Sequence, residues 1–172
     1  KMECEYAVIG SGIIGLAVAR SLKQKQPKSH IVIFEKERKS PLHASGRNSG
    51  VIHAGFYYTS DSLKARFTRE GNKRLTRYCE EKNLRINKCG KVVVARTPEE
   101  KKTILEREQR GRNNGVDVRL IDEHELAVIE PNAKTCDIAL HSPTTSTADP
   151  IELCQSLRQD LIMDGVEFVY GV

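Results

Sequence analysis

The sequence predicts an α/β fold around a parallel β-sheet, and three observations lead to this prediction. An apolar segment of strand length, residues 6–9, enters a Gly-x-Gly-x-x-Gly pattern at residues 10–15, and a helix-length apolar segment leaves it. A second strand-like segment, residues 30–34, ends on Glu35. After a helical stretch, residues 166–170 read as a strand that returns to the same sheet in parallel. The first strand–helix–strand unit is expected to cross over right-handed.

Each glycine of the pattern has a physical role. Gly10 permits the tight turn, Gly12 lets the backbone approach a pyrophosphate, and Gly15 lets the helix pack closely on the strand. The helix directs its unpaired N–H groups and the positive end of its dipole at the phosphates. Glu35 follows about 20 residues later, where a carboxylate accepts hydrogen bonds from ribose hydroxyls. The pattern therefore predicts a dinucleotide, FAD or NAD, and the alternative is a glycine-rich loop without a nucleotide. Glu35 disfavours NADP, because its carboxylate would repel a 2′-phosphate.

A second informative segment runs from His43 to Gly55 and is rich in glycine, serine and asparagine. Such a loop can wrap an anion or a planar ring through its backbone N–H groups. The alternative is an ordinary surface loop between a strand and a helix.

Composition excludes several classes of protein. Hydrophobic residues make up 38% and charged residues 30% of the 172 residues, which suits a soluble globular protein of one domain, or one and part of a second. No apolar run approaches the roughly 18 residues of a membrane-spanning helix. Aromatic residues are 5% with no tryptophan, which disfavours nucleic-acid binding. The five cysteines show no zinc-site spacing, so we predict no metal site and reduced thiols.

The formal net charge is +5, with lysine and arginine dense in residues 23–39 and 64–85. One interpretation is steering of an acidic substrate, and another is attraction to an anionic membrane surface. Solvated helix faces are the simpler interpretation, which we favour.

A long helix is predicted from residues 60–61, with Asp61 as its cap and Asn83 as its end. Its apolar stripe, spaced as in a helix and predicted to be core, consists of Leu63, Phe67, Leu75 and Tyr78.

The following segments alternate between strand-like and helix-like patterns. A strand at 86–96 precedes a charged helix at 99–112, a strand at 118–121, a short helix between Asp122 and Pro131, a strand at 138–141 and a polar connector at 142–147. A last helix has Pro150 in its first turn and ends at Gly165, with the apolar face Ile151, Leu153, Leu157 and Leu161.

The motifs together resemble FAD-dependent oxidoreductases of the D-amino-acid-oxidase-like (DAO) superfamily, along essentially the whole chain. The matching features are the glycine pattern, Glu35-Lys36-Glu37, His43, the run from Asn48 to Gly55, Tyr57-Tyr58, Ser62-Leu63-Lys64-Ala65, Cys89-Gly90-Lys91 and Glu130-Pro131. Within the superfamily the motifs are most similar to the enzymes that oxidise L-2-hydroxyglutarate, although these carry histidine at the position of Arg47.

The resemblance implies FAD as the cofactor, bound by a Rossmann-like parallel sheet. The residues expected to bind it are Gly10, Ser11, Gly12, Ile14, Gly15, Glu35, Lys36, His43, Ser45, Arg47, Asn48, Ser49 and Gly50. For His43, a non-covalent contact and a covalent bond to the flavin are both open, and Arg47 either neutralises a phosphate or faces solvent.

The resemblance also implies an activity: oxidation of an L-2-hydroxy acid, with L-2-hydroxyglutarate converted to 2-oxoglutarate by hydride transfer to the flavin. His53 is the candidate catalytic residue, because a neutral imidazole can take a hydroxyl proton near pH 7; a structural histidine is the alternative. Alternative functions are an amino-acid oxidase, a glycerol-3-phosphate dehydrogenase or a non-catalytic FAD-binding module. Oxygen, a quinone or a carrier is expected to accept the electrons.

The expected organisation is an FAD-binding domain at residues 1–82 and 147–172, interrupted at 83–146 by an incomplete mixed α+β substrate domain. The family comparison implies that these residues are part of a longer enzyme. We expect a small acidic substrate, and a location in the cytoplasm or at an inner membrane as a peripheral protein, mitochondrial if the source is eukaryotic.

Overall fold

The computed structural model describes residues 3–172, so residues 1 and 2 of the expected first segment lie outside the described part. The chain forms two compact units: the part up to Gly50 with Asp149–Val172, and Val51–Ala148. These boundaries differ from the expected ones after residues 82 and 146. The assignment of each segment to FAD or to substrate stays a prediction.

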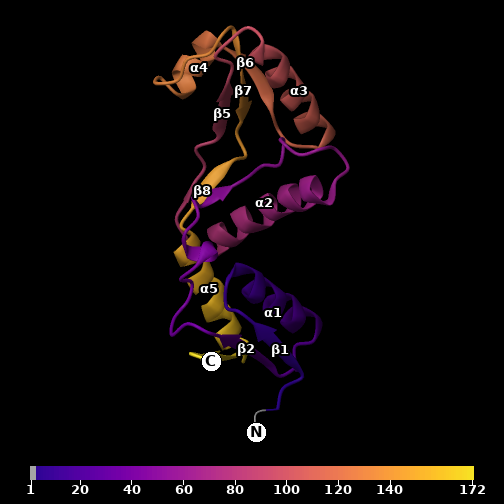
Figure 1. The fold of residues 1–172 in the computed structure, drawn as a ribbon, viewed down its shortest axis with the longest axis vertical. Helices are drawn as coiled ribbons and strands as arrows, with labels where there is room; N and C mark the ends of the chain where they lie inside the picture. Colours follow the sequence, from indigo (N-terminus) through magenta and orange to yellow (C-terminus); the bar gives the residue numbers. More distant parts are fainter. Residues whose placement is uncertain (1–2) are drawn as a thin grey trace. The chain divides into compact units, whose positions relative to one another are not determined.

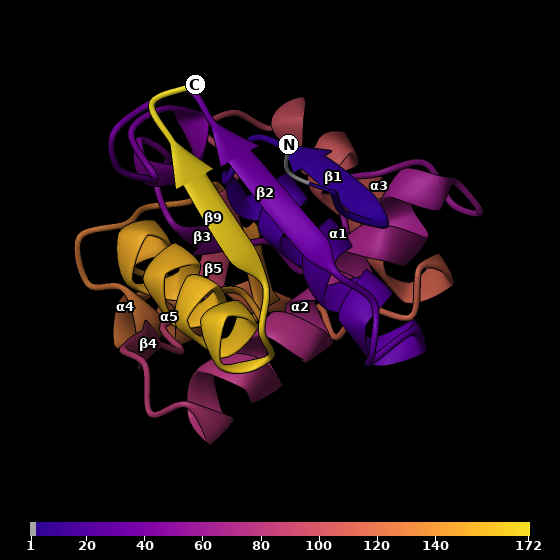
Figure 2. The same cartoon turned by 90° about the horizontal axis from the view of Figure 1, so that it is seen from below.

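The first unit contains the predicted parallel sheet. Strands β1 (Tyr6–Ile9), β2 (Ile31–Glu35) and β9 (Glu167–Tyr170) lie in the order β1-β2-β9, and both pairings are parallel. Helices α1 (Ile13–Lys25) and α5 (Pro150–Met163) lie on the same face of this sheet (Figure 2). The α/β prediction and the return of the last strand to the sheet are therefore confirmed.

Local sequence explains why these elements form. The Asp149 carboxylate accepts hydrogen bonds from the Ile151 and Glu152 amides, which caps α5, and Pro150 occupies its first turn. On α5 the expected face is buried at Leu153, Leu157 and Leu161, whereas Ile151 is 41% exposed. The central strand β2 is a continuous apolar run whose fully buried members are Ile31, Val32 and Ile33.

The second unit is built on two antiparallel sheets (Figure 1). The larger has the order β5-β7-β6, from Lys91–Val94, Ile138–Ser142 and Arg119–Asp122. The smaller has the order β3-β8-β4, from Val51–Ile52, Ser146–Ala148 and Ile86–Asn87. The helices of this unit are α2 (Leu63–Glu81), α3 (Glu100–Asn113) and α4 (Glu123–Ile129), and a short 3-10 turn, η1 (Ala44–Gly46), belongs to the first unit.

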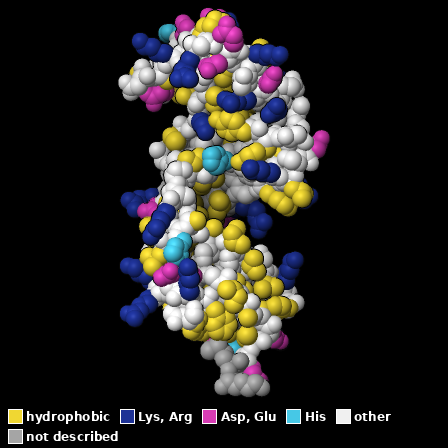
Figure 3. Space-filling model, in the orientation of Figure 1, with side chains coloured by type: hydrophobic (Ala, Val, Ile, Leu, Met, Phe, Trp, Pro, Cys, Tyr) yellow, Lys and Arg dark blue, Asp and Glu magenta, His cyan; other side chains and the backbone are white. Residues whose placement is uncertain are grey.

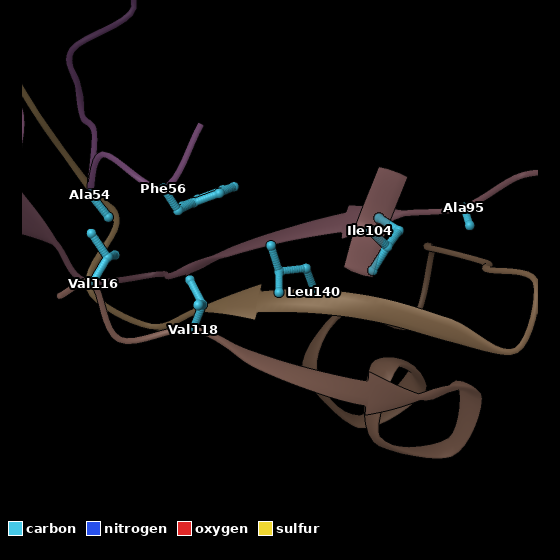
Figure 4. Close-up of a cluster of buried hydrophobic side chains, with 7 residues drawn as sticks. All are labelled: Ala54, Phe56, Ala95, Ile104, Val116, Val118 and Leu140. Atoms are coloured by element: carbon cyan, nitrogen blue, oxygen red, sulfur yellow. The ribbon is translucent and has the colours of Figure 1, made fainter. Parts of the chain in front are cut away.

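The core of the second unit lies between α3 and the larger sheet (Figure 4). Phe56, which is 1% exposed, is packed in this cluster with Ile104 of α3 and Leu140 of β7. Gly111 of α3 allows this approach, because a Cβ atom there would lie 2.5 Å from Cγ2 of Val118. The segment that carries Phe56 is thereby fixed to the sheet.

The structure corrects the prediction for the long helix in two respects. Its cap is Ser62, whose hydroxyl accepts a hydrogen bond from the Ala65 amide, whereas Asp61 has a left-handed φ of 62°. Leu63 and Phe67 are 66% and 59% exposed and do not belong to the core. The buried side of α2 consists of Ala65, Asn72, Tyr78 and Cys79, so the core position predicted for Tyr78 is confirmed. The polar Asn72 on this side keeps it from forming a purely apolar stripe in the sequence.

Two further predictions are refined. The strand expected at 86–96 is two strands, β4 and β5, in different sheets, and Gly90 between them has a left-handed φ of 70°. The expected polar connector at 142–147 contains the start of β8. The cap of α4 by Asp122 is confirmed, because its carboxylate accepts a hydrogen bond from the Glu125 amide.

Candidate functional site

The glycine pattern forms the turn between β1 and α1, called the glycine bend below (residues 10–15). Gly10 has a φ of 95°, and its amide donates to the Phe34 carbonyl of β2 over 2.7 Å. A Cβ atom on Gly15 would lie 1.9 Å from the Gly10 carbonyl oxygen, which no side chain can accommodate. The turn and close-packing roles expected for these two glycines are therefore visible in the geometry.

Ser45 gives Gly12 a role that the sequence pattern does not reveal. A Cβ atom on Gly12 would lie 2.9 Å from the Ser45 hydroxyl oxygen. That oxygen accepts a hydrogen bond from the Ile13 amide, the first N–H of α1, over 3.0 Å. The absence of a side chain at Gly12 thus lets the loop that contains Ser45 contact the glycine bend directly.

The start of α1 keeps free donors. Within residues 3–172, the Ile14 and Gly15 amides have no protein acceptor, while the Leu16 amide donates to the Gly12 carbonyl. The first turn carries no acidic side chain, and the Ile14 side chain is 74% exposed. Open N–H groups and the positive end of the helix dipole make this end suited to an anion such as a phosphate.

Glu35 is buried at the end of β2, and it is bound to the glycine bend. Its Oε2 accepts hydrogen bonds from the Ser11 amide and the Ser11 hydroxyl, each over 2.8 Å, and its Oε1 accepts one from the Glu37 amide. Burial raises the pKa of Glu35, but these hydrogen bonds and the nearby His43 outweigh it, so the net pKa is lowered. A carboxylate oxygen has two lone pairs, and Oε1 can accept a further bond from a ribose hydroxyl.

The loop from Lys36 to Gly50 contains the remaining expected cofactor residues. Nε2 of His43 lies 2.8 Å from Oε1 of Glu37, which ties the two ends of a charged segment together. Asn48 shapes the following turn, because its amide nitrogen donates to the Ala44 and Ser45 carbonyls and its oxygen accepts from the Gly50 amide. Most side chains of this loop are exposed, among them the expected cofactor residues Lys36, His43, Arg47, Asn48 and Ser49.

These residues fit an FAD-type dinucleotide. The free amides of the glycine bend can donate hydrogen bonds to a pyrophosphate, and Glu35 can accept hydrogen bonds from ribose hydroxyls. Ser11 joins the two groups by donating from the bend to the carboxylate. All expected cofactor residues lie in the first unit.

His53, the candidate catalytic residue, lies in the second unit just after β3. The His53 side chain is exposed, but its partial removal from water lowers its pKa first, and the positive charge of Lys91 lowers it further, so the imidazole is neutral near pH 7. This is the protonation state that a general base requires.

Two buried asparagines that sequence analysis did not identify hold the segment around His53. The side-chain nitrogen of Asn72 donates to the carbonyls of Ile52, His53 and Thr144 at 3.1, 3.2 and 2.9 Å. The side-chain nitrogen of Asn114 donates to the Gly55 and Tyr58 carbonyls at 3.2 and 2.9 Å. An asparagine in a helix or at its end is ordinarily read as surface or turn, so no local signal marks this role.

Comparison with known proteins supports the prediction made from the motifs. A profile of the family described as FAD dependent oxidoreductase (DAO) matches residues 5–172. The chain belongs to this family. Its relatives include the mitochondrial L-2-hydroxyglutarate dehydrogenase of Nematostella vectensis, 37% identical over 97% of this chain and 37% of that protein. The L-2-hydroxyglutarate dehydrogenase of Indibacter alkaliphilus is 40% identical over 86% of the chain and 37% of that protein.

Solved structures with this fold act on several kinds of substrate. L-alpha-glycerophosphate oxidase from Mycoplasma pneumoniae, with FAD bound, matches 99% of the chain with a TM-score of 0.88 and 24% identity, over 45% of its own length. L-proline dehydrogenase from P. horikoshii matches 98% with a TM-score of 0.86 and 22% identity, over 44% of its length. At this identity the structures show the fold. The chain spans less than half of the length of each of these four proteins.

Proposed function

We propose that this chain is the part of an FAD-dependent oxidoreductase that holds the cofactor's phosphates and ribose, and that the enzyme oxidises L-2-hydroxyglutarate to 2-oxoglutarate. The observation that carries the proposal is the glycine bend bound to Glu35, in a chain that is 37–40% identical to two L-2-hydroxyglutarate dehydrogenases. When bound, FAD supplies the acceptor for the hydride that leaves the hydroxyl-bearing carbon.

The residues of the chain have distinct tasks in this proposal. The Ile14 and Gly15 amides bind the pyrophosphate, and Glu35 accepts the ribose hydroxyls. His53 accepts the proton of the substrate hydroxyl as the carbon–hydrogen bond breaks, which balances the charge that the departing hydride leaves behind. Asn72 is a positioning residue, because it fixes the backbone carbonyl of His53.

The proposal also covers the surface charge of the protein and its location in the cell. On the face shown in Figure 3, basic side chains (dark blue) are interspersed with acidic ones (magenta) over the upper part of the second unit. Among residues 3–172, no helix has both the length and the apolar character needed to cross a bilayer. Peripheral binding to anionic membranes stays a prediction, which co-sedimentation with anionic vesicles would check. A mitochondrial location is proposed if the source is eukaryotic, as for the Nematostella relative.

The proposal is tested by anaerobic titration of the full-length protein. L-2-hydroxyglutarate should bleach the flavin absorption band, while its D-enantiomer, glycerol 3-phosphate, glycine and L-proline should not. His53→Gln should retain FAD and lose about 100-fold in the rate of bleaching, within the range for removal of a general base. Bleaching by an amine or by glycerol 3-phosphate in place of the hydroxy acid would overturn the substrate assignment, and a protein that refuses FAD would overturn the whole proposal.

The pH dependence gives an independent check on His53. Because its pKa is lowered from 6.5, the basic form persists below that value. The acid limb of kcat/KM should therefore lie below pH 6.5 and should disappear in His53→Gln. An acid limb that is unchanged in the variant would assign the base to another group.

A further inference from the structure

Two cationic side chains of the second unit converge on one aromatic ring. The Lys91 ammonium lies 4.9 Å from the centroid of the Tyr57 ring, and the Arg107 guanidinium carbon lies 5.1 Å from it. The three residues come from separate segments: the loop after β3, the start of β5, and α3. The buried ring of Phe56, whose centroid is 4.1 Å away, holds the Tyr57 ring in place.

This cluster has no internal counter-charge. Within residues 3–172, neither Lys91 nor Arg107 forms an ion pair, and the Tyr57 hydroxyl has no hydrogen-bond partner. Because the Lys91 ammonium and the Arg107 guanidinium lie 4.9 and 5.1 Å from the centre of the same ring, their positive charges are close enough to repel each other. Five other basic residues of this unit do have acidic partners, in the pairs Arg66–Glu70, Lys88–Glu80, Lys101–Asp137, Arg112–Glu108 and Arg119–Glu125.

The environment of the cluster strengthens its attraction for an anion. Tyr57, Lys91 and Arg107 are all partly buried, so solvent can reach them but screens their charges less than at a fully exposed position. Lys91 is also close enough to lower the pKa of His53. Through Lys91, the cluster therefore acts electrostatically on the candidate base.

We propose that Lys91, Arg107 and the Tyr57 hydroxyl form a binding site for one carboxylate group of the dicarboxylate substrate. This site deepens the proposed function and rests on it for the identity of the substrate. A guanidinium can bind a carboxylate through two parallel hydrogen bonds, while an ammonium and a phenol hydroxyl each contribute one donor. A carboxylate among these groups would relieve the repulsion between the two cations. It would also hold the substrate in the neighbourhood of His53.

The test measures binding of glutarate to the full-length, FAD-loaded protein by titration calorimetry. Glutarate carries the two carboxylates of the proposed substrate but no hydroxyl, so binding is measured without oxidation. Arg107→Met and Lys91→Met should each weaken binding about 10-fold or more, and Tyr57→Phe by about 3-fold, as expected for loss of charged and neutral hydrogen bonds. Lys91→Arg, which keeps the charge, should retain most of the affinity.

The matched controls are Arg110→Met on α3 and Lys102→Met on the same helix, which remove a positive charge from exposed positions. Both should change glutarate affinity by less than about twofold, because exposed charges are screened. If the control variants lose as much glutarate affinity as the cluster variants, the overall positive field of the protein attracts glutarate and the proposed site is wrong. A wild-type protein that does not bind glutarate, or unchanged affinity in Arg107→Met and Lys91→Met, would also overturn the proposal.

Failure of this site and failure of the proposed function give different results. If the enzyme oxidises L-2-hydroxyglutarate but the cluster variants bind glutarate normally, the site is wrong and the function stands. If the hydroxy acid is not oxidised but glutarate binding depends on the cluster, the function is wrong and a carboxylate site stands. Tyr57→Phe and Lys91→Arg preserve the ring and the charge, so they report on the site even where the methionine variants do not fold.

Discussion

The two units build their candidate sites in different ways. In the first unit, the phosphate and ribose groups would meet backbone amides and one carboxylate that lie within a short stretch of sequence, joined by Ser11. In the second unit, His53, Tyr57, Lys91 and Arg107 come from distant segments, and buried side-chain amides of Asn72 and Asn114 hold the segment that bears the first two. The site in the first unit consists of backbone groups, so its geometry depends on glycines that leave room for them. The site in the second unit consists of side chains, so its geometry depends on the buried asparagine hydrogen bonds that hold their segments.

The first prediction, with the largest expected effect, concerns Gly15. Gly15→Ala places a Cβ atom 1.9 Å from the Gly10 carbonyl oxygen, and neither backbone segment can move without opening the bend. We expect a loss of about 3 kcal/mol or more in the free energy of unfolding, and loss of FAD binding. Urea denaturation and flavin content measure the two effects.

The matched control is Gly71 of α2, a helical glycine in the second unit with nothing within 4 Å of its would-be Cβ atom. Gly71→Ala should stabilise the protein by about 0.5–1 kcal/mol, because alanine is the better helix former. If both substitutions have similar effects, the distinction between a glycine that packs against backbone and one that does not is wrong.

The second prediction removes the polar contact on which the second unit depends. Asn72→Ala leaves the Ile52, His53 and Thr144 carbonyls without their shared donor. We expect a loss of about 1–3 kcal/mol in unfolding free energy. In the assembled enzyme kcat should fall while the affinity for FAD stays unchanged, because the cofactor residues lie in the first unit. Asn113→Ala, at an exposed position, is the control; a fall in stability without any change in kcat would make Asn72 purely structural.

The third prediction has the smallest effect on stability and concerns Glu35. Its folded-state pKa is lowered from 4.5, so the carboxylate stabilises the folded state above pH 4.5, and this contribution is lost as the pH falls through the lower folded-state value. Glu35→Gln should cost about 1 kcal/mol at pH 7, and the gap to wild type should close in acid. Denaturation midpoints across the pH range measure the gap; a gap of constant size would show that the charge of Glu35 is unimportant. At pH 7 the variant should also bind FAD about 10-fold more weakly.

The same contrast explains how much could be predicted from the sequence. The glycine bend, Glu35 and the cap Asp122 were predicted, because each belongs to a pattern with a characteristic spacing along the chain. The exposure of Leu63 and Phe67 was not, since the apolar pattern of α2 does not reveal that its buried side includes Asn72.

The local sequence patterns also could not predict which distant segments of the chain lie next to each other. Gly90 directs β4 and β5 into different sheets, although the sequence there reads as one strand. The convergence of Lys91 and Arg107 on Tyr57 depends on where α3 packs against the larger sheet. Resemblance to a family identified the cofactor, but the contacts that join these side chains required the fold.

The hydroxyl of Ser45 fills the space above Gly12 and takes up the first amide of α1. A single hydroxyl thus joins the 43–50 loop to the start of α1, and a side chain at residue 12 would push the two apart.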